Sequence, residues 1–459
     1  MKILVVGNGG REHAMLWALG RGADQASGPA KSGAKGGSRN RSGGAELFCA
    51  PGSAGTAGLA RNLPLDTDNP AAVVAACREL GIALVIVGPE VPLAAGLVDA
   101  LAAAGIAAFG PPRKAAALEA SKAFARSFCE RRGVPCAATA RFAPGRGAAE
   151  LRRFLDERRG GRLVLKKSGL AAGKGVLDSD DPAELRAFGE AVLETDELLA
   201  EEFLVGRELS VFGLCTEKGH VLLEPAADHK KALAGDRGPN TGGMGAVSPL
   251  PFADAALMAR IEREIVAPSF EGMAAEGLSY RGVLFFGVMA TAEGPKLLEY
   301  NVRFGDPETQ SLLPRLESGF EELCAAVAEG SLPSPRFSRR HACGIVVAAP
   351  GYPISHPVGL PVDLGAIDSG CDSGNPEAQA GPAPLAGETE PTALLFHAAT
   401  GRDAEGRLRT GGGRSFTAVG LGPDWSLARE RAYALARKVN FEGAWFRPDI
   451  GDRIFGAPR

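Results

Sequence analysis

The sequence lacks any apolar run approaching the ~20 residues that a helix needs to cross a bilayer. Its first residues, Met1 to Gly7, reach a glycine too early for a signal peptide and are typical of a strand. An excess of one sign of charge is also lacking, because the formal net charge is -3. These absences argue against a membrane protein and against a general nucleic-acid binder. Any anion site must therefore be built from local lysine and arginine.

Cysteine and histidine patterns that would indicate a metal site are missing as well. The eight cysteines form no C-x-x-C pair and show no zinc spacing, and the histidines are not paired. Most cysteines lie in apolar stretches, which favours buried free thiols and a reducing, cytoplasmic location over a disulfide framework. No Ser-His-Asp or Cys-His arrangement is visible, so a covalent enzyme nucleophile is not indicated.

What the sequence does contain is a succession of short apolar strands and helices. With 459 residues, 45% of them hydrophobic, the chain should form two to four soluble domains. A strand, the glycine loop Gly7–Gly10 and a helix from Arg11 to about Leu19 form one unit. A second unit ends in the apolar run Ala83–Val87 followed by Gly88–Glu90. This alternation predicts a doubly wound parallel sheet, with both loops at the strand ends where ligands bind.

The stretch Gly20–Gly44 is rich in Gly, Ser, Ala, Lys and Arg and has no large aliphatic or aromatic residue. It cannot bury enough apolar surface to offset the entropy of ordering, so we expect a flexible surface insertion. A basic nucleic-acid-binding tail is the alternative.

The remaining chain divides into three further parts. We expect one helix from Arg113 to about Gly133, then a compact α+β module that could close as a lid. A larger module from Leu209 to about Leu332 follows, and a linker at Pro333–Arg340 leads to a C-terminal domain. The lid should contain strands Leu163–Lys167 and Leu198–Phe203 and helix Pro182–Leu193. The C-terminal domain should contain strands Ala342–Ala348, Ala393–Ala398 and Phe416–Leu421 and a helix from Ser426 to about Lys438.

The stretch Leu297–Thr309 carries the clearest chemical signal. Glu299 and Asn301 lie two residues apart at the end of an apolar run, so on a strand both side chains point to one face. Their oxygen atoms suit Mg²⁺, which is usually held by one or two protein groups together with substrate phosphates. Arg303 adds a planar cation that can bind a carboxylate or phosphate through two hydrogen bonds. An exposed strand face is the alternative interpretation.

Two glycine-rich loops are candidate phosphate sites. Gly7–His13 only partly matches the dinucleotide fingerprint, because Glu12 occupies the place of the third glycine, and it can equally be a bare helix-start turn. Lys166 precedes the loop Gly169–Gly175, which carries a second lysine, Lys174, but lacks the G-K-[ST] ending of a Walker A loop. A hairpin with solvated lysines is the alternative there.

Two polar segments complete the candidates. Glu201–Glu208 ends a strand and reverses the chain, so an acidic side chain there could bind adenine or ribose, although a charged turn is the commoner reading. Asp228–Lys230 and the glycine-rich Gly238–Gly245 form a long polar loop, which is either a linker or a ligand-binding segment.

Taken together, these residues closely resemble the glycinamide ribonucleotide synthetase (phosphoribosylamine–glycine ligase) family of the ATP-grasp superfamily. The pairing of G-P-N-T-G-G-M-G at Gly238–Gly245 with N-x-R-F-G-D-P-E-T-Q at Asn301–Gln310 is the most specific part of the likeness. The likeness runs nearly end to end and also covers Gly7–His13, Ala50–Thr56, Val87–Leu93, Ser121–Phe124, Gly169–Val176, Glu201–Leu204, Asp228–Lys230, Phe396–Ala398, Gly411–Arg414 and Asp449–Gly451.

The resemblance implies an α/β protein with an ATP-grasp fold, in which a doubly wound parallel-sheet domain comes first. A small α+β lid and a C-terminal mixed α+β domain complete it. The expected ranges are 1–121 for the N-terminal substrate-binding domain, 122–332 for the ATP-grasp domain with its lid at about 134–207, and 333–459 for the C-terminal domain.

The resemblance also implies roles for single residues. Glu299 and Asn301 look like ligands of Mg²⁺ or Mn²⁺, and Arg303, Asp228 and Lys230 would act near the transferred phosphate. The implied ATP-binding residues are Lys122, Lys166, Gly169, Gly173, Lys174, Gly175, Glu201, Glu202, Leu204 and Glu208. The implied substrate-binding residues are Gly9, Gly10, Glu90, Gly242, Gly243 and Asp306.

The implied reaction is the ATP-dependent ligation of glycine to 5-phosphoribosylamine through glycyl phosphate, a step of de novo purine synthesis. The implied partners are these small molecules and, transiently, the enzyme that makes phosphoribosylamine. Another ATP-grasp carboxylate–amine ligase and a catalytically silent nucleotide-binding relative are the alternatives. The sequence departs from the family in the Gly20–Gly44 insertion, in Ser168 where an aspartate is usual, and in a shortened lid before Glu201.

Overall fold

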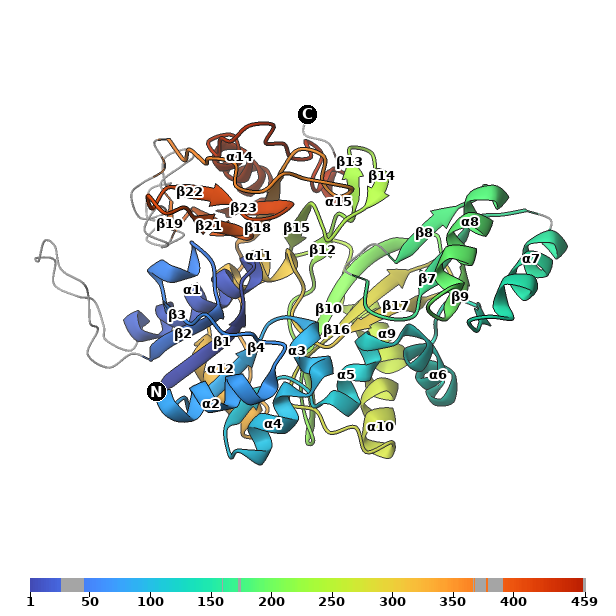
Figure 1. Ribbon diagram of the computed structural model, residues 1–459, viewed down its shortest axis with the longest axis horizontal. Coiled ribbons are helices and arrows are strands. Elements are labelled where there is room, and N and C mark those ends of the chain that lie inside the picture. The colour runs from blue at the N-terminus through green and yellow to red at the C-terminus, as the bar shows by residue number, and fades with distance from the viewer. Residues whose placement is uncertain are drawn as a thin grey trace, which may run out of the picture.

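The computed structural model of the 459-residue chain describes residues 1–25, 45–158, 160–171, 175–365, 367, 377–378 and 391–456. Residues 26–44 of the predicted insertion lie outside these ranges, as do Gly173 and Lys174 of the predicted phosphate loop. The N-terminal and C-terminal sheets lie together at one end of the molecule, and a smaller module projects at the other end (Figure 1). A central antiparallel sheet lies between them.

The N-terminal sheet is parallel throughout, with the strand order β3-β2-β1-β4-β5. Its first strand is apolar on both faces because Leu4 and Val6 pack into one buried cluster and Ile3 and Val5 into another. Val6 pairs with Val87, which brings the loops after β1 and β4 side by side. The predicted doubly wound sheet is confirmed. Its elements are β1 (Lys2–Gly7), α1 (Gly10–Gln25), β2 (Glu46–Pro51), η1 (Thr56–Gly58), β3 (Arg61–Asn62), α2 (Pro70–Leu80), β4 (Leu84–Val87), α3 (Glu90–Ala95), α4 (Leu97–Ala103) and β5 (Ala107–Phe109).

The first helix is longer than the sequence suggested. We expected α1 to end near Leu19, but it runs to Gln25, so the first six residues of the predicted insertion Gly20–Gly44 are helical. A glycine inside a helix costs only about 1 kcal/mol, and the buried side chains of the preceding turns outweigh that cost. Arg21 adds to this, because its guanidinium lies 4.9 Å from the centre of the Trp17 ring.

The single helix expected from Arg113 to about Gly133 is wrong. The chain forms two helices, α5 (Arg113–Ala120) and α6 (Lys122–Arg132), which are separated by Ser121 in an extended conformation. The Ser121 hydroxyl caps α6 by accepting a hydrogen bond from the Phe124 amide over 3.2 Å. The break makes Lys122 the first residue of α6.

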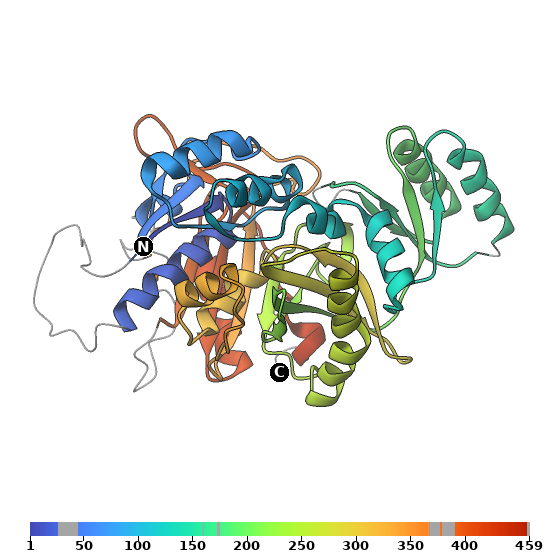
Figure 2. The same ribbon diagram turned by 90° about the horizontal axis from the view of Figure 1, so that it is seen from below.

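The projecting module, which we call the lid, is an antiparallel sheet with the strand order β6-β9-β7-β8. Its own small core includes Leu151, Leu165 and Leu185, and Figure 2 shows it as a separate lobe. The predicted strand Leu163–Lys167 and helix Pro182–Leu193 have the expected bounds. The lid consists of β6 (Thr139–Phe142), α7 (Gly147–Glu157), β7 (Leu163–Lys167), β8 (Val176–Ser179), α8 (Pro182–Leu193) and β9 (Leu198–Glu202).

The central sheet is antiparallel, with the order β11-β10-β16-β17. Its edge strand β17 carries Glu299 and Asn301, the predicted metal ligands. Its strands are β10 (Arg207–Thr216), β11 (Gly219–Leu222), β16 (Gly282–Ala290) and β17 (Pro295–Asn301). The helices of this part of the chain are α9 (Ala255–Ile261), the π-helical turn η2 (Glu262–Val266), α10 (Ala267–Ala275), α11 (Glu308–Leu312), η3 (Leu313–Arg315) and α12 (Phe320–Ala328).

The C-terminal sheet reaches back into the central part of the chain. Its order is β12-β15-β18-β23-β20-β19, so two strands that precede the linker complete it. The predicted C-terminal strands and helix are present with small shifts at their ends. The elements are β12 (Ala227–Asp228), β15 (Gly245–Ser248), β18 (His341–Ala348), β19 (Glu377–Ala378), β20 (Ala393–His397), β21 (Thr400–Arg402), β22 (Leu408–Thr410), β23 (Arg414–Gly422), α14 (Trp425–Ala436) and α15 (Asp452–Phe455).

The long polar loop expected around Gly238–Gly245 is partly a hairpin. Strands β13 (Lys231–Leu233) and β14 (Arg237–Asn240) pair antiparallel between β12 and β15. The turn signal at Gly235 and Asp236 was not recognised in the sequence; both residues have positive φ angles there.

Seven cysteines fall in the described ranges, and all seven are free thiols, six of them buried. Within the described part of the chain, no helix combines the length and apolarity that a membrane span requires.

Candidate functional site

A cavity of about 460 Å³ lies where the N-terminal, central, lid and C-terminal parts of the chain meet. Its wall carries equal numbers of basic and acidic side chains. The basic ones are Arg11, Lys122, Arg126, Lys166, Lys230, Arg303 and Arg414, and the acidic ones are Glu90, Glu119, Glu201, Asp228, Glu299, Asp306 and Glu308. A pocket with this composition is suited to a highly charged ligand rather than to an apolar one.

The edge strand β17 presents Glu299 and Asn301 to this cavity. The ammonium of Lys230 lowers the pKa of Glu299 to about 2, with help from Lys166 and Lys122 and against the effect of burial. An ionised carboxylate and an amide oxygen on one strand fit a hard divalent cation that takes its other ligands from phosphates. Among the described residues no cluster of three or more acidic, histidine or cysteine side chains could hold a metal without a ligand's help.

Lys230 lies between two carboxylates. Its Nζ atom is 2.5 Å from Glu208 and 3.4 Å from Glu299. Burial opposes its charge, but Glu208, Glu299 and Asp228 together hold the pKa of the ammonium well above its ordinary value. Burial raises the pKa of neighbouring Asp228 to about 8, although Lys230 acts in the opposite direction. Asp228 can therefore gain or lose a proton near neutral pH.

Lys166 and Glu201 form a buried pair between neighbouring strands β7 and β9. The Lys166 Nζ atom lies 2.7 Å from Glu201 Oε2, and Arg126 donates from Nε to Glu201 Oε1 over the same distance. Burial works against ionisation, yet Lys166 and Arg126 keep the pKa of Glu201 below its ordinary value. Lys166 also donates to the Leu298 carbonyl on β17, which links the lid to the central sheet.

Ser168 joins the lid to the start of α6. Its carbonyl accepts from the Lys122 amide over 2.9 Å, and its hydroxyl accepts from the Ala123 amide over 3.2 Å. The Lys122 ammonium in turn donates to the Gly169 carbonyl. Burial lowers the pKa of Lys122, and the carboxylate of Glu299 partly offsets this. Lys122 and the Gly169 loop are therefore held as one unit.

Arg303 is held from two sides. Its Nη2 atom donates to Glu119 over 2.7 Å, and its Nε atom lies 3.3 Å from Glu90. The Val302 amide donates to the other oxygen of Glu119. Burial raises the pKa of Glu119 to about 7, although Arg303 acts in the opposite direction.

The glycine pair Gly242-Gly243 is anchored by the C-terminal domain. Arg414 donates from Nη1 to the carbonyls of Gly242 and Asp306 over 2.6 and 2.8 Å, and the Gly242 amide donates to the Tyr352 hydroxyl. The Arg414 guanidinium also lies 3.4 Å from the Asp306 carboxylate. The two halves of the most specific sequence motif are thereby brought together.

The structure places most of the predicted site residues on the cavity wall: Glu90, Lys122, Lys166, Gly175, Glu201, Asp228, Lys230, Gly242, Glu299, Asn301, Arg303 and Asp306. Gly169 and Glu208 bind wall lysines without lining the cavity themselves. Gly9, Gly10, Glu202, Leu204 and Gly243 do not line the cavity either. The Gly9 amide donates to Glu12, and Glu202 binds Lys296 and the Ala138 amide.

The wall also carries polar residues that sequence reasoning did not assign to the site, among them Glu119, Arg126, Glu308, Tyr352 and Arg414. Arg126, Glu308 and Arg414 lie in or beside motif segments, and this proximity was the available signal. Glu119 lies in an alanine-rich helix and Tyr352 in a loop, and neither has a local pattern that indicates a site. Their positions depend on tertiary packing.

Comparison with protein families gives matches over most of the chain. The model of the phosphoribosylglycinamide synthetase ATP-grasp (A) domain matches residues 120–309, that of the N domain matches 37–119, and that of the C domain matches 342–453. The phosphoribosylamine–glycine ligase of Caulobacter vibrioides is 40% identical over 99% of this chain and 98% of its own length. The one of Agrobacterium fabrum is also 40% identical, over 98% of both chains.

Solved structures agree with these matches. The crystal structure of phosphoribosylamine–glycine ligase from Thermotoga maritima superposes with a TM-score of 0.77 at 30% identity, over 98% of this chain and 100% of that one. The biotin carboxylase of Campylobacter jejuni, solved in a β,γ-ATP complex, superposes with a TM-score of 0.67 over 97% and 92% of the two chains. At 15% identity this second likeness concerns the fold alone.

Proposed function

Because the chain belongs to the phosphoribosylglycinamide synthetase family, we propose that it is an ATP-dependent ligase that joins glycine to 5-phosphoribosylamine. The products are glycinamide ribonucleotide, ADP and phosphate, and the reaction is the second step of de novo purine synthesis. One observation carries the proposal. Glu299 and Asn301, the predicted metal ligands, line the same cavity as three lysines, Lys122, Lys166 and Lys230. The Gly242-Gly243 segment, which Arg414 holds in place, lies beside them.

The reaction needs positioning and charge neutralisation more than an enzyme nucleophile. A carboxylate is a poor electrophile, so the glycine carboxylate first attacks the γ-phosphorus of ATP, and ADP leaves. The amine of phosphoribosylamine then attacks the carbonyl of glycyl phosphate, and phosphate leaves as the amine loses a proton. Well-oriented reactants alone can supply ~7–11 kcal/mol of the rate enhancement, and fixed cations stabilise the charge on the transferring group.

Glu299 and Asn301 are the residues that would hold the divalent cation, Mg²⁺ or Mn²⁺. A bound cation would supply positive charge to the phosphates of the nucleotide. The low pKa of Glu299 supports this role, because the carboxylate is ionised over the whole physiological range.

The nucleotide would bind between the lid and the central sheet. Lys122, Lys166 and the loop Gly169–Gly175, with Gly173 and Lys174, would contact the phosphates. Glu202 and the Leu204 backbone would face adenine, and Glu208 the ribose. The carboxylate of Glu201 is engaged by Lys166 and Arg126, so its part in the site is to hold both cations in place beneath the nucleotide.

The two other substrates would bind on the opposite wall. Arg303 would bind the carboxylate or the transferring phosphoryl group through its planar fork. Asp228, with a pKa of about 8, is suited to accept the proton that the attacking amine loses. Gly9, Gly10 and Glu90 would face phosphoribosylamine, and Gly242, Gly243 and Asp306 would complete the substrate site.

We propose the domain limits 1–121, 122–332 with the lid at about 134–207, and 333–459. The free thiols support a reducing, cytoplasmic location. A transient contact with the enzyme that makes phosphoribosylamine would shield that labile amine from water.

The test is product formation from ATP, glycine and freshly made phosphoribosylamine in the presence of Mg²⁺. We expect glycinamide ribonucleotide, ADP and phosphate in equal amounts and a strict need for both co-substrates. Phosphate release that does not depend on glycine or on phosphoribosylamine would indicate another ATP-grasp ligase. ATP binding without turnover would indicate a catalytically silent relative.

A further inference from the structure

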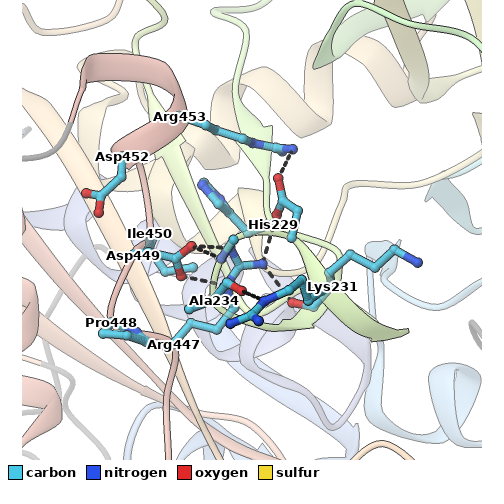
Figure 3. Close-up of polar contacts among 12 residues, drawn as sticks. His229, Lys231, Ala234, Arg447, Pro448, Asp449, Ile450, Asp452 and Arg453 are labelled. Atoms are coloured by element: carbon cyan, nitrogen blue, oxygen red, sulfur yellow. Dashed lines mark hydrogen bonds and ion pairs between the residues drawn. The ribbon is translucent and has the colours of Figure 1, made fainter.

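The segment Arg447–Arg453, close to the end of the chain, lies against the strand and hairpin that carry Asp228 and Lys230. Figure 3 shows Arg447, Asp449 and Arg453 of this segment reaching toward His229 and Lys231. The segment belongs to the C-terminal domain and is held there by α14: Tyr433 donates to the Arg447 carbonyl, and Arg429 donates to the carbonyls of Pro448 and Ile450. The segment is therefore a fixed surface. We call its contacts with residues 228–236, made by Arg447, Gly451 and Arg453, the clamp.

Arg447 is the centre of this clamp. Its side chain is only 2% exposed, and its Nη1 atom donates to the Lys231 carbonyl over 2.7 Å and to Asp236 over 3.0 Å. Its Nε and Nη2 atoms bind the two oxygens of Asp449 over 2.9 and 2.8 Å. Asp449 also accepts from the Gly235 amide at the hairpin turn. One guanidinium thus ties the start and the turn of the β13–β14 hairpin to the C-terminal domain.

Two neighbouring residues hold the chain just before the hairpin. Arg453 donates from Nη2 to the Asp228 carbonyl over 2.7 Å, and the Gly451 amide donates to His229 Nε2 over 2.9 Å. The backbone is therefore held at residues 228 and 231, and the side chain is held at residue 229. Lys230, which lies between these supports, points its side chain into the cavity, where it meets Glu208 and Glu299.

We propose that Arg447 is a positioning residue for the reaction, acting through Lys230, with Arg453 as its second support. This inference rests on the proposed role of Lys230 beside the transferred phosphate. Fixing the carbonyls of residues 228 and 231 sets the direction in which the Lys230 side chain leaves the backbone. A misplacement of about 1 Å at a reacting group can cost about a hundredfold in rate. A rigid backbone on both sides of Lys230 would therefore raise the rate by keeping its ammonium in position.

The chemistry of the clamp supports positioning over simple packing. Burying a guanidinium is costly, and apolar residues of similar volume often serve stability equally well. A planar fork bound to carboxylates on two different segments gives directional precision that apolar packing does not. The same clamp also acts on the lid, because the Lys231 ammonium lies 2.5 Å from Asp178 on β8.

The test compares the full-length protein with its Arg447→Met variant in the glycinamide ribonucleotide assay. We expect kcat to fall by about tenfold or more and KM for ATP to change less than about threefold, since Lys230 acts on the transferring group rather than on the nucleotide as a whole. Arg407→Met is the matched control. Arg407 belongs to the same domain, is exposed and pairs only with Asp403 and Glu405 in the described structure, and its loss should leave kcat unchanged.

A double variant separates positioning from stability. In a Lys230→Arg background, which keeps a cation in the cavity, Arg447→Met should lower kcat further by less than about threefold. The fall in Tm that Arg447→Met causes should be the same in this background as in the wild-type background. An equal loss of kcat in both backgrounds would overturn the proposal, and so would a lower Tm with wild-type kcat at temperatures where the variant is folded.

If Arg447→Met does not fold, Arg453→Met decides, because it leaves Arg447 and both of its carboxylate partners in place. We expect a fall in kcat of at least about threefold, and unchanged kcat would overturn the clamp. An inactive wild-type protein would count against the proposed function, whereas an active wild type with equally active clamp variants counts against the clamp alone.

Discussion

Arg303 donates from Nη2 to the carboxylate of Glu119 over 2.7 Å, and this contact joins α5 to the chain just after β17, the strand that carries Glu299 and Asn301. Glu119 is 8% exposed at its side chain and has the carboxylates of Glu90 and Glu299 as further charged neighbours. Burial outweighs Arg303 and raises the pKa of Glu119 to about 7, which has a consequence for stability.

Glu119→Gln should change how stability depends on pH. The folded protein keeps the Glu119 proton up to about pH 7, whereas the unfolded chain loses it near the ordinary value of 4.5. This contribution is present at low pH and is lost as pH rises toward 7, by about 1.4 kcal/mol per pH unit at most. We expect the difference in unfolding free energy between wild type and Glu119→Gln to shift toward the variant from pH 5 to pH 7.5. A constant difference would contradict the raised pKa.

His229 should make stability depend on pH in the opposite sense to Glu119, because its contribution is lost as pH falls. Burial, reinforced by Arg453 and Arg447, lowers its pKa to about 3, and the Gly451 amide requires the lone pair of Nε2. The unfolded chain takes up this proton near pH 6.5, so the contribution is present above that value and is lost as pH falls. Between pH 7.5 and 5.5 the wild type should lose about 1 kcal/mol more than His229→Gln, whose amide oxygen can still accept from Gly451. Denaturant titrations at both pH values measure this.

Glu299→Gln should abolish Mg²⁺-dependent turnover, because it removes the one ionised oxygen pair on β17 that faces the cavity. It should also leave Lys230 with Glu208 as its main partner. Glu293→Gln, in the turn before the same strand and 80% exposed, is the control and should keep its activity. Mg²⁺ titrations of the steady-state rate distinguish the two, and a wild-type Mg²⁺ response in Glu299→Gln would remove this residue from the metal site.

Gly243→Ala should impair the site because of its backbone. Gly243 has a φ of 105°, a conformation that L side chains rarely adopt, and an added methyl group would overlap with Pro307. We expect a loss of about 1–3 kcal/mol in stability together with lower activity. Gly401→Ala has open space around it and no positive φ, so it should be neutral in thermal unfolding and in rate.

Local patterns predicted those parts of the fold in which sequence and packing agree. The helix Pro182–Leu193 was found with its bounds because Asp181 caps it and Pro182 occupies its first turn. The break at Ser121 was missed because a single serine, although a good N-cap, does not by itself end an otherwise helical sequence. The carbonyl and hydroxyl of Ser168, far along the chain, bind the amides of Lys122 and Ala123 instead, and this tertiary contact overrides helix propensity.

The candidate site shows the same division. Glu299, Asn301 and the lysines were accessible because their spacing carries chemistry in itself. Arg414 and Tyr352 reach Gly242 from more than a hundred residues away, and Glu119 gains its importance only by facing Arg303. The length of α1 was misjudged because composition alone cannot tell a helix end from a loop when the preceding turns are buried.

Because basic and acidic side chains balance on the cavity wall, most of its lysines and arginines are already paired with carboxylates of the protein before any ligand binds. A polyphosphate can bind one of these lysines only when that lysine gives up its ion pair with a carboxylate of the wall. Lys230 can leave Glu299 at a low cost in free energy only when another cation takes its place beside Glu299. Nucleotide and divalent ion should therefore enter as a matched pair, each lowering the dissociation constant of the other.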